Sequence, residues 1–353
     1  YMTVGIYTVL GESFFDFSKN VPFDFYNKID GESVRYIYYH LMAGSFFYTM
    51  GFFLFFKKRS TSVLMKLDLN TTIKDKHIYF VFLITIILLH VGYGVEHLYY
   101  REGYTLGDAG VSFARVLYTL CLPLTCLLIP FSKNTLISLF FSVVLFVLVM
   151  GTSSRNLVLI PACIFLGGVI KNGRVSFLKS LLYGILVVFS VTISIQSRNH
   201  AIQGVWPNIL SLFDSGFDLL VMSYAINYLT SYSIFASSLA YQNYSPDLLS
   251  LYYSVTPLPS SAIDVKYMIE SQKLNANSPI PALGLLALNG PLVFCTYYFI
   301  SGSVLAIFGG FLAKINKPLN IFVVMFILVF SFLSLQYNLR GTTRVLYYLI
   351  FIS

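Results

Sequence analysis

Long apolar runs, separated by short polar connections, extend over most of this 353-residue chain. Most of the runs are close to the ~20 apolar residues that an α-helix needs to cross the hydrocarbon core of a bilayer. The pattern predicts an all-α polytopic membrane protein, a bundle of about ten or more transmembrane helices. The predicted spans are 36–56, 78–95, 112–131, 135–151, 157–170, 177–196, 284–313 and 319–337, with a partial span at 1–10 and a cut-off one at 345–353.

Two segments do not fit a simple span. The run at 284–313 is longer than a bilayer requires and has three glycines near its end, so we expect it to tilt or break. The segment 219–245 carries no charge but is rich in Ser, Tyr and Asn, and we interpret it as an interfacial or re-entrant element. A further span there is the alternative, and it would invert the topology of everything that follows.

Basic residues in the connections set the predicted orientation. The segments 57–76, 132–134, 171–179 and 314–317 are basic, and the positive-inside rule places them in the cytoplasm. Alternation from there leaves one large external loop over 197–283, with interfacial helices. We therefore predict a single membrane domain over 1–353.

The composition excludes a soluble domain. Charged residues make up 11% of the chain, whereas a soluble domain has about 25%. The four cysteines lie in apolar runs without metal-binding spacing, and we interpret them as small core residues. The chain opens in an apolar run with no basic residue before it, so no cleavable signal peptide is predicted. We expect no metal, no cofactor and no nucleic-acid partner.

Arginine and lysine divide between the two predicted sides of the membrane. The predicted cytoplasmic connections hold ten Lys and two Arg, whereas the predicted external side holds four Lys and seven Arg. A guanidinium presents a planar fork of donors that binds phosphate oxygens in pairs, which an ammonium does not. We therefore predict a pyrophosphate-binding site at the external end of the bundle.

The external arginines differ in their sequence surroundings. Arg35 and Arg101 lie close to glutamates and are interpreted as ordinary loop charges, while Arg115 begins a span and either snorkels or binds substrate. The others lack an acidic residue within ten positions, and boundary charges of that kind are candidate functional residues. The arginines predicted to bind pyrophosphate are Arg155, Arg198, Arg340 and Arg344.

The large external segment adds a candidate base and a candidate anion-binding loop. His200 is its only histidine, and the pKa of an imidazole suits proton transfer, with a structural role as the alternative. In "TPLPSSAID" (256–264), Ser260 and Ser261 offer hydroxyls and backbone donors at a predicted helix start, which favours an anion. The prolines predicted to stiffen the loop are Pro257, Pro259 and Pro281, and simple loop punctuation is the alternative for this region.

Several of these motifs together resemble a known family. They are "GTSSRN" (151–156) at an outer turn, an Arg at the exit into one large external loop, "TPLPSS" (256–261) within that loop, and "NSPIPALGLLALNG" (277–290) before the next span. The chain resembles the bacterial oligosaccharide repeat-unit polymerases of the Wzy type over most of its length. The resemblance implies a fold similar to the lipid-linked transferases of the glycosyltransferase-C class, which work without a metal.

The resemblance also implies a reaction and a place. Such proteins extend O-antigen or capsular chains on the periplasmic face of the bacterial inner membrane. They transfer the growing glycan from undecaprenyl pyrophosphate to the next lipid-linked repeat unit. The implied partners are this carrier-linked oligosaccharide, membrane lipids and a chain-length regulator.

In this scheme the arginines stabilise the departing pyrophosphate, and a base takes a proton from the acceptor hydroxyl. Arg155, Arg198 and His200 form the predicted catalytic set. Asp214, Asp264 and Glu270 are alternative bases.

Two positions depart from the family pattern. Leu285 replaces an acidic residue of the family, and Ile209 stands where some members have a glycine eleven residues after an arginine.

Three other functions remain open. An O-antigen ligase would use the same donor and the same arginines. A lipid-linked oligosaccharide flippase or other transporter would show internal repeats and charges at mid-membrane depth. An O-acyltransferase would need a paired histidine and carboxylate, for which His97 beside Glu96 is the candidate.

Overall fold

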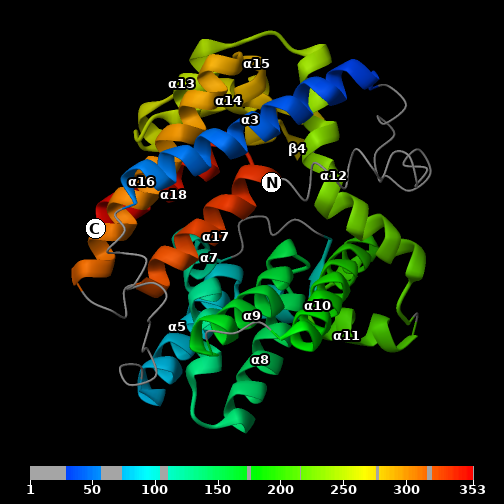
Figure 1. Cartoon of the computed structure of the whole chain (residues 1–353). Coiled ribbons are helices and arrows are strands. Elements are labelled where there is room, and N and C mark those ends of the chain that lie inside the picture. Colours follow the sequence, from blue (N-terminus) through cyan, green and yellow to red (C-terminus); the bar gives the residue numbers. More distant parts are fainter. Residues whose placement is uncertain are drawn as a thin grey trace. The chain divides into compact units, whose positions relative to one another are not determined.

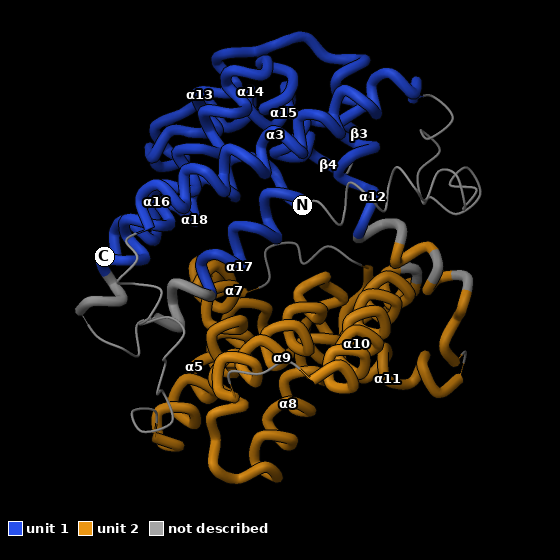
Figure 2. The backbone as a smooth tube through the Cα atoms, in the orientation of Figure 1, with its two compact units in different colours: residues 1–64, 227–353 blue, residues 65–226 orange. Residues whose placement is uncertain are grey.

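The computed structural model describes residues 29–56, 74–103, 110–172, 176–214, 216–275, 278–315 and 320–352. These residues are almost entirely helical, as predicted (Figure 1). They belong to two compact units: unit 1 comprises residues 1–64 and 227–353, and unit 2 comprises residues 65–226 (Figure 2). The sequence predicts a single membrane domain over 1–353. That domain stays a prediction.

Unit 2 consists of helices that run back and forth between two ends. Near one end, a two-stranded antiparallel sheet pairs β1 (Arg101–Glu102) with β2 (Ile202–Gln203). The helices and 3₁₀ turns of the unit are α5 (Asp75–Tyr93), α6 (Val95–Tyr99), α7 (Ser112–Leu128), η3 (Ile129–Phe131), α8 (Thr135–Met150), η4 (Arg155–Val158), α9 (Leu159–Asn172), α10 (Phe177–Gln196), η5 (Ser197–Asn199) and α11 (Val205–Asp214).

Unit 1 packs its helices around an apolar core that includes Ile37, Phe235, Leu286 and Phe294. A second small hairpin joins β3 (Lys273–Asn275) to β4 (Ser278–Pro279). The border with unit 2 falls inside α12. The helices are α3 (Gly31–Phe55), α12 (Leu219–Asn243), α13 (Leu248–Val255), η6 (Ser260–Ala262), α14 (Val265–Ser271), α15 (Ala282–Leu288), α16 (Pro291–Ile315), α17 (Asn320–Gln336) and α18 (Leu339–Ile352).

Several helices are long and apolar enough to cross a membrane, as the sequence predicts. Among the described residues five meet both criteria: Asp75–Tyr93, Ser112–Phe131, Arg155–Asn172, Phe177–Gln196 and Pro291–Phe311. Thr135–Met150 and Met325–Leu335 are shorter apolar helices. The chain is therefore an all-α membrane protein. The number of ten or more spans stays a prediction.

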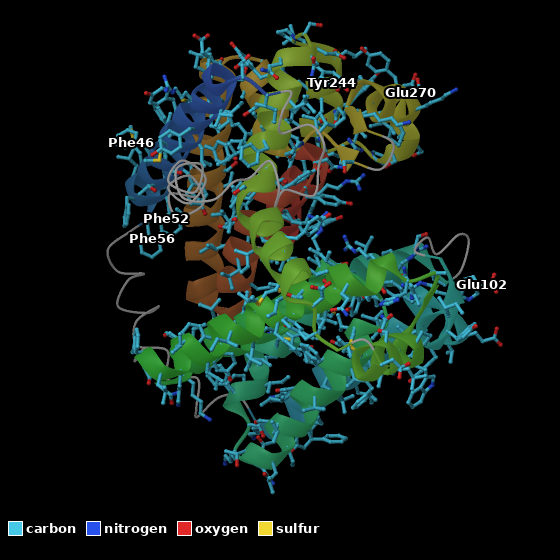
Figure 3. All side chains as sticks on the ribbon, turned by 90° about the vertical axis from the view of Figure 1, so that its right-hand side faces the viewer. Phe46, Phe52, Phe56, Glu102, Tyr244 and Glu270 are labelled. Atoms are coloured by element: carbon cyan, nitrogen blue, oxygen red, sulfur yellow. The ribbon has the colours of Figure 1, made fainter. Side chains whose placement is uncertain are left out.

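The predicted spans near the two ends of the chain have different outcomes. The run 36–56 forms α3, which is not among the five helices above. Phe46 and Phe52 project from this helix, and Phe56 directly follows its end (Figure 3). The described part of the run 345–353 belongs to α18, which starts earlier, at Leu339, ends at Ile352 and carries two arginines. The run 1–10 lies outside the described residues.

Residues 284–313 are broken, as expected, but at a different place. The break separates α15 from α16 at Asn289 and Gly290, far from the three glycines near the end of the run. Gly290 has a φ of 95°, which residues with a Cβ rarely adopt. Pro291 starts the next helix, because the fixed φ of proline suits the first helical position. Gly290 and Pro291, near the start of the run, therefore determine where the helix breaks.

The segment 219–245 forms the 25-residue helix α12. Its second half is buried in unit 1, with Ser231, Ser233, Ser237 and Ser238 enclosed beside Phe235. It is not among the five helices that meet the criteria for a span. Its interfacial or re-entrant placement stays a prediction.

Close packing of α3 against α16 depends on glycine. A Cβ at Gly51 would overlap the carbonyl oxygen of Phe299, and a Cβ at Gly302 would overlap that of Tyr48. Small residues at such crossings allow the two backbones to approach. Figure 1 shows the two helices side by side.

Candidate active site

Arginine and lysine occupy opposite ends of unit 2. Contacts between connections define these ends: Arg101 bonds the carbonyl of Gly151, and Lys171 bonds that of Pro130. Because α5, α7, α8, α9 and α10 alternate in direction, every described arginine of the unit falls at one end and every described lysine at the other. The arginine end holds Arg101, Arg115, Arg155 and Arg198, and the lysine end holds Lys74, Lys76, Lys133, Lys171 and Lys179.

The turn after α8 is the centre of the arginine end. An α-helix leaves its last carbonyls without intrahelical partners, and its C-terminus carries partial negative charge. Here Asn208 Nδ2 donates to Met150 O at 2.8 Å, Arg101 Nη1 donates to Gly151 O at 2.7 Å, and Arg198 Nε donates to Ser153 O at 2.9 Å. Buried cations at this end are thus stabilised by helix carbonyls.

Ser153 and Ser154 shape the segment that presents Arg155. Ser153 has a φ of 50°, the left-handed conformation that costs a residue with a Cβ about 1–2 kcal/mol. Its hydroxyl accepts from Asn208 Nδ2 at 3.1 Å, which helps to hold the turn. Ser154 caps η4 by accepting from Asn156 N. Arg155 follows as the first residue of η4, half-buried.

His200 lies next to this turn in the same unit. Gln203 Nε2 donates to Arg198 O at 3.2 Å and to His200 O at 3.3 Å, and Gln203 Oε1 accepts from Arg101 Nη2 at 3.1 Å. The Nε2 atom of His200 is buried and makes no hydrogen bond to the described residues. The imidazole therefore has one ring nitrogen enclosed beside the turn without a hydrogen bond from the described residues.

A second arginine pair lies at the start of α18 in unit 1. Arg340 is buried, and its guanidinium donates to the carbonyl oxygens of Tyr253, a very short contact, and of Leu258, at 2.8 Å. Arg344 is one helical turn further on and half-buried, and its Nη2 donates to Ser260 Oγ at 3.0 Å. The pair thus faces the loop 256–261.

Proline and a cap set the path of that loop. Pro259 is extended, with a ψ of 157°, and leads into the single 3₁₀ turn η6. The predicted helix start at Ser260 and Ser261 is therefore one short turn, and the α-helix α14 begins at Val265 instead. The reason is Asp264, whose side chain accepts from Tyr267 N and caps α14. Pro281 is likewise extended and directly precedes α15.

The guanidiniums of Arg340 and Arg344 act on each other electrostatically. Burial, followed by the positive charge of Arg344, lowers the pKa of Arg340. No carboxylate is among the hydrogen-bond partners of Arg340 or Arg344 in the described part of the chain. Two like charges four residues apart on a helix repel each other, so an anion between them would stabilise both.

An apolar groove runs along α10 in unit 2. It has a volume of about 560 Å³ and includes Leu181, Val188, Phe189, Phe217 and Met222 among its lining residues. The last residue of α10 that lines the groove is Phe189. Arg198 follows it nine residues later in the sequence, after the end of the same helix. An apolar groove of this kind fits a hydrocarbon chain.

The predicted site residues fall into two groups, one in each unit. Unit 2 brings together Arg155, Arg198 and His200, and unit 1 brings together Arg340, Arg344 and Ser260. Ser261 and Pro257 are exposed beside the latter group.

The alternative bases have other surroundings. Asp264 caps α14, and Asp214 is exposed at the end of α11. Glu270 is exposed and projects from α14 (Figure 3). No described contact joins any of these three residues to either arginine group.

Three residues at the arginine end were missed in the sequence. Arg101, interpreted as an ordinary loop charge, is 4% exposed and bonded to Gly151 and Gln203. The interpretation was wrong because Glu102 next to it points to the other side of the strand. Asn208 and Gln203 are buried polar residues, each 1% exposed. The sequence showed only that both lie in a loop expected outside the membrane, and it did not show that they are buried.

The remaining candidates are explained by packing. Leu285, in place of the family's acidic residue, is buried in the core of unit 1. His90 bonds Ile86 O and Tyr99 Oη. Among the described residues no group of three or more His, Cys, Asp or Glu is placed to hold a metal ion.

Comparisons of the chain with protein-family models, with curated proteins and with solved structures find no match.

Proposed function

We propose that this chain is a membrane glycosyltransferase that polymerises lipid-linked oligosaccharide repeat units. The donor is a glycan on undecaprenyl pyrophosphate, and the acceptor is the next lipid-linked repeat unit. The anomeric carbon of the donor forms a bond to the acceptor hydroxyl, the bond to pyrophosphate breaks, and the hydroxyl proton passes to a base. The short sequence motifs and the arginine groups both support this reaction.

The observation that carries the proposal is the pair Arg340 and Arg344. An arginine has five N–H donors. Arg344 uses one of them on Ser260, and the described residues accept no hydrogen bond from the other four. Arg340 is held by two backbone carbonyls and fixes the position of the pair. A rigid set of unused donors beside a second positive charge suits a diphosphate leaving group.

Unit 2, taken by itself, also has features that suit such a substrate. The groove along α10 fits part of a polyprenyl chain, and Arg155 and Arg198 place positive charge at the arginine end of the same unit. His200 is the preferred base, because its buried Nε2 has no partner among the described residues.

The experiment is complementation of a deletion strain, with surface polysaccharide resolved on a gel. Wild-type protein should restore the ladder of long chains. Arg344→Lys keeps the charge but loses the fork, so chain extension should fall by about 10²–10³-fold, as when one oxyanion donor is removed. The matched control is Arg35→Lys, because Arg35 is exposed in the same unit, on α3.

The gel also distinguishes other functions. Product capped at a single repeat in the deletion strain supports the polymerase. Complete loss of surface product would contradict it and indicate a ligase or a flippase. A normal ladder from Arg344→Lys would contradict the role assigned to the arginine pair.

A further inference from the structure

A groove with two lysines in a largely apolar lining lies at the lysine end of unit 2, between α8, α9 and α10. Its volume is about 840 Å³, within the range of about 300–1,000 Å³ that small-molecule sites have. Lys171 and Lys179 line it, and none of the described lining residues is acidic. The other lining residues with polar groups are Ser132, Thr135, Ser138, Ser142, Asn172, Ser176 and Tyr183.

The rest of the lining is apolar, and so are the helix surfaces around it. Ile164, Phe165 and Leu182 form part of the wall. Leu139 on α8 is 62% exposed and Leu182 on α10 is 54% exposed, and both line the groove. On helices of a membrane protein, such exposed apolar side chains contact acyl chains. The groove is therefore polar and cationic on one side and continuous with a lipid-facing surface on the other.

The two lysines differ in how firmly they are held. Lys171 Nζ donates to Pro130 O at 2.6 Å and to Ser132 O at 3.4 Å. An ammonium has three donors, so one N–H of Lys171 remains for a ligand at a fixed position. Lys179 is exposed near the start of α10. One fixed and one adjustable cation suit a phosphate group that enters from the side.

We propose that this groove binds an anionic phospholipid. The lipid phosphate contacts Lys171 and Lys179, and the acyl chains lie against the exposed apolar surfaces of α8 and α10. The charge of the lining selects an anionic over a zwitterionic headgroup. Basic pockets between membrane helices bind anionic headgroups in this way. This site is at the opposite end of unit 2 from the arginines, and it does not depend on the proposed function.

The test is native mass spectrometry of the full chain in detergent. Phosphatidylglycerol is the probe, and phosphatidylcholine with the same acyl chains is the neutral reference. Wild-type protein should prefer phosphatidylglycerol. The double variant Lys171→Gln/Lys179→Gln should lose about 25-fold in its affinity, because each lysine beside an anionic lipid contributes about fivefold.

Lys133→Gln is the matched control for charge. Lys133 is exposed at the same end but does not line the groove. Its loss should change the affinity by less than about twofold, since charges in water are screened. An equal effect of Lys133→Gln, or an unchanged affinity in the double variant, would overturn the proposal.

A variant that fills the groove tests the proposal without changing a lysine, in case Lys171→Gln disturbs folding. Gly168 lines the groove, and a Cβ there meets no atom within 4 Å. Gly168→Leu should therefore fill the groove and abolish the preference for phosphatidylglycerol. Gly184→Leu, an equally open position that lines the other groove, should leave it intact. Retained preference in Gly168→Leu, or displacement of the lipid by millimolar glycerol phosphate, would contradict a lipid site.

Discussion

Contacts of single residues at helix ends explain how several arginines of this chain are held. Arg101 and Arg198 bond carbonyls at and just after the end of α8, and Arg340 bonds one at the end of α13. A helix C-terminus has partial negative charge, so these cations have partners that no sequence pattern displays. Arg344 instead bonds a hydroxyl and keeps several donors that the described residues do not use.

Ser153 permits a prediction about the turn at the arginine end. Ser153→Gly and Ser153→Ala both remove the hydroxyl that bonds Asn208, but only glycine adopts a φ of 50° without cost. The glycine variant should be more stable than the alanine variant by about 1–2 kcal/mol. Thermal unfolding of both proteins in detergent measures the difference. Equal stability would show that the left-handed turn is not retained.

Arg340 permits a prediction that separates stability from catalysis. Arg340→Lys should reduce the free energy of unfolding by about 1.5–3 kcal/mol. A lysine ammonium lacks the planar set of donors with which the guanidinium bonds the carbonyls of Tyr253 and Leu258 together. Arg344→Lys should change it by less than about 0.5 kcal/mol, as the residue is half-buried and makes one described hydrogen bond. The comparison uses the same unfolding assay. The reverse order would contradict the positioning role of Arg340.

At the level of the elements, apolar patterning predicted where helices form but not their ends or their contacts. The runs at 78–95, 112–131 and 177–196 became helices within a few residues of the predicted bounds. The break in 284–313 depends on Gly290, and α18 starts after Asn338, whose side chain accepts from Gly341 N. Average hydrophobicity registers neither feature. The sequence analysis assigned Arg340, Arg344 and Ser260 to one site, and in the structure Arg344 Nη2 donates to Ser260 Oγ. Their placement on the external side stays a prediction, and the motifs did not reveal which atoms these side chains bond.

The crossing of α3 and α16 gives a prediction at this level. Gly302→Ala places a methyl group against the carbonyl of Tyr48, so the helices must separate. The loss should be about 1–3 kcal/mol, as in other overpacked interfaces. Gly184→Ala, with no atom within 4 Å of the new methyl, should be neutral or slightly stabilising. Unfolding in detergent compares the two, and equal effects would contradict the close crossing.

For the whole molecule, the separation of arginine and lysine predicts how the chain lies in the membrane. A single cysteine at Glu102, exposed at the arginine end, should react with a membrane-impermeant maleimide from outside the cell. One at Asn172, exposed at the lysine end, should react only after the membrane is opened. The four native cysteines are first replaced by alanine. Labelling of both positions from one side would contradict the predicted topology.

The most direct measurement is chain extension by the purified protein supplied only with lipid-linked repeat units. Wild-type protein should produce a ladder of longer glycans on the lipid carrier. Arg344→Lys should extend chains about 10²–10³-fold more slowly while Arg35→Lys works normally. Absence of longer glycans with folded wild-type protein, or equal rates for wild type and Arg344→Lys, would contradict pyrophosphate departure assisted by this guanidinium pair.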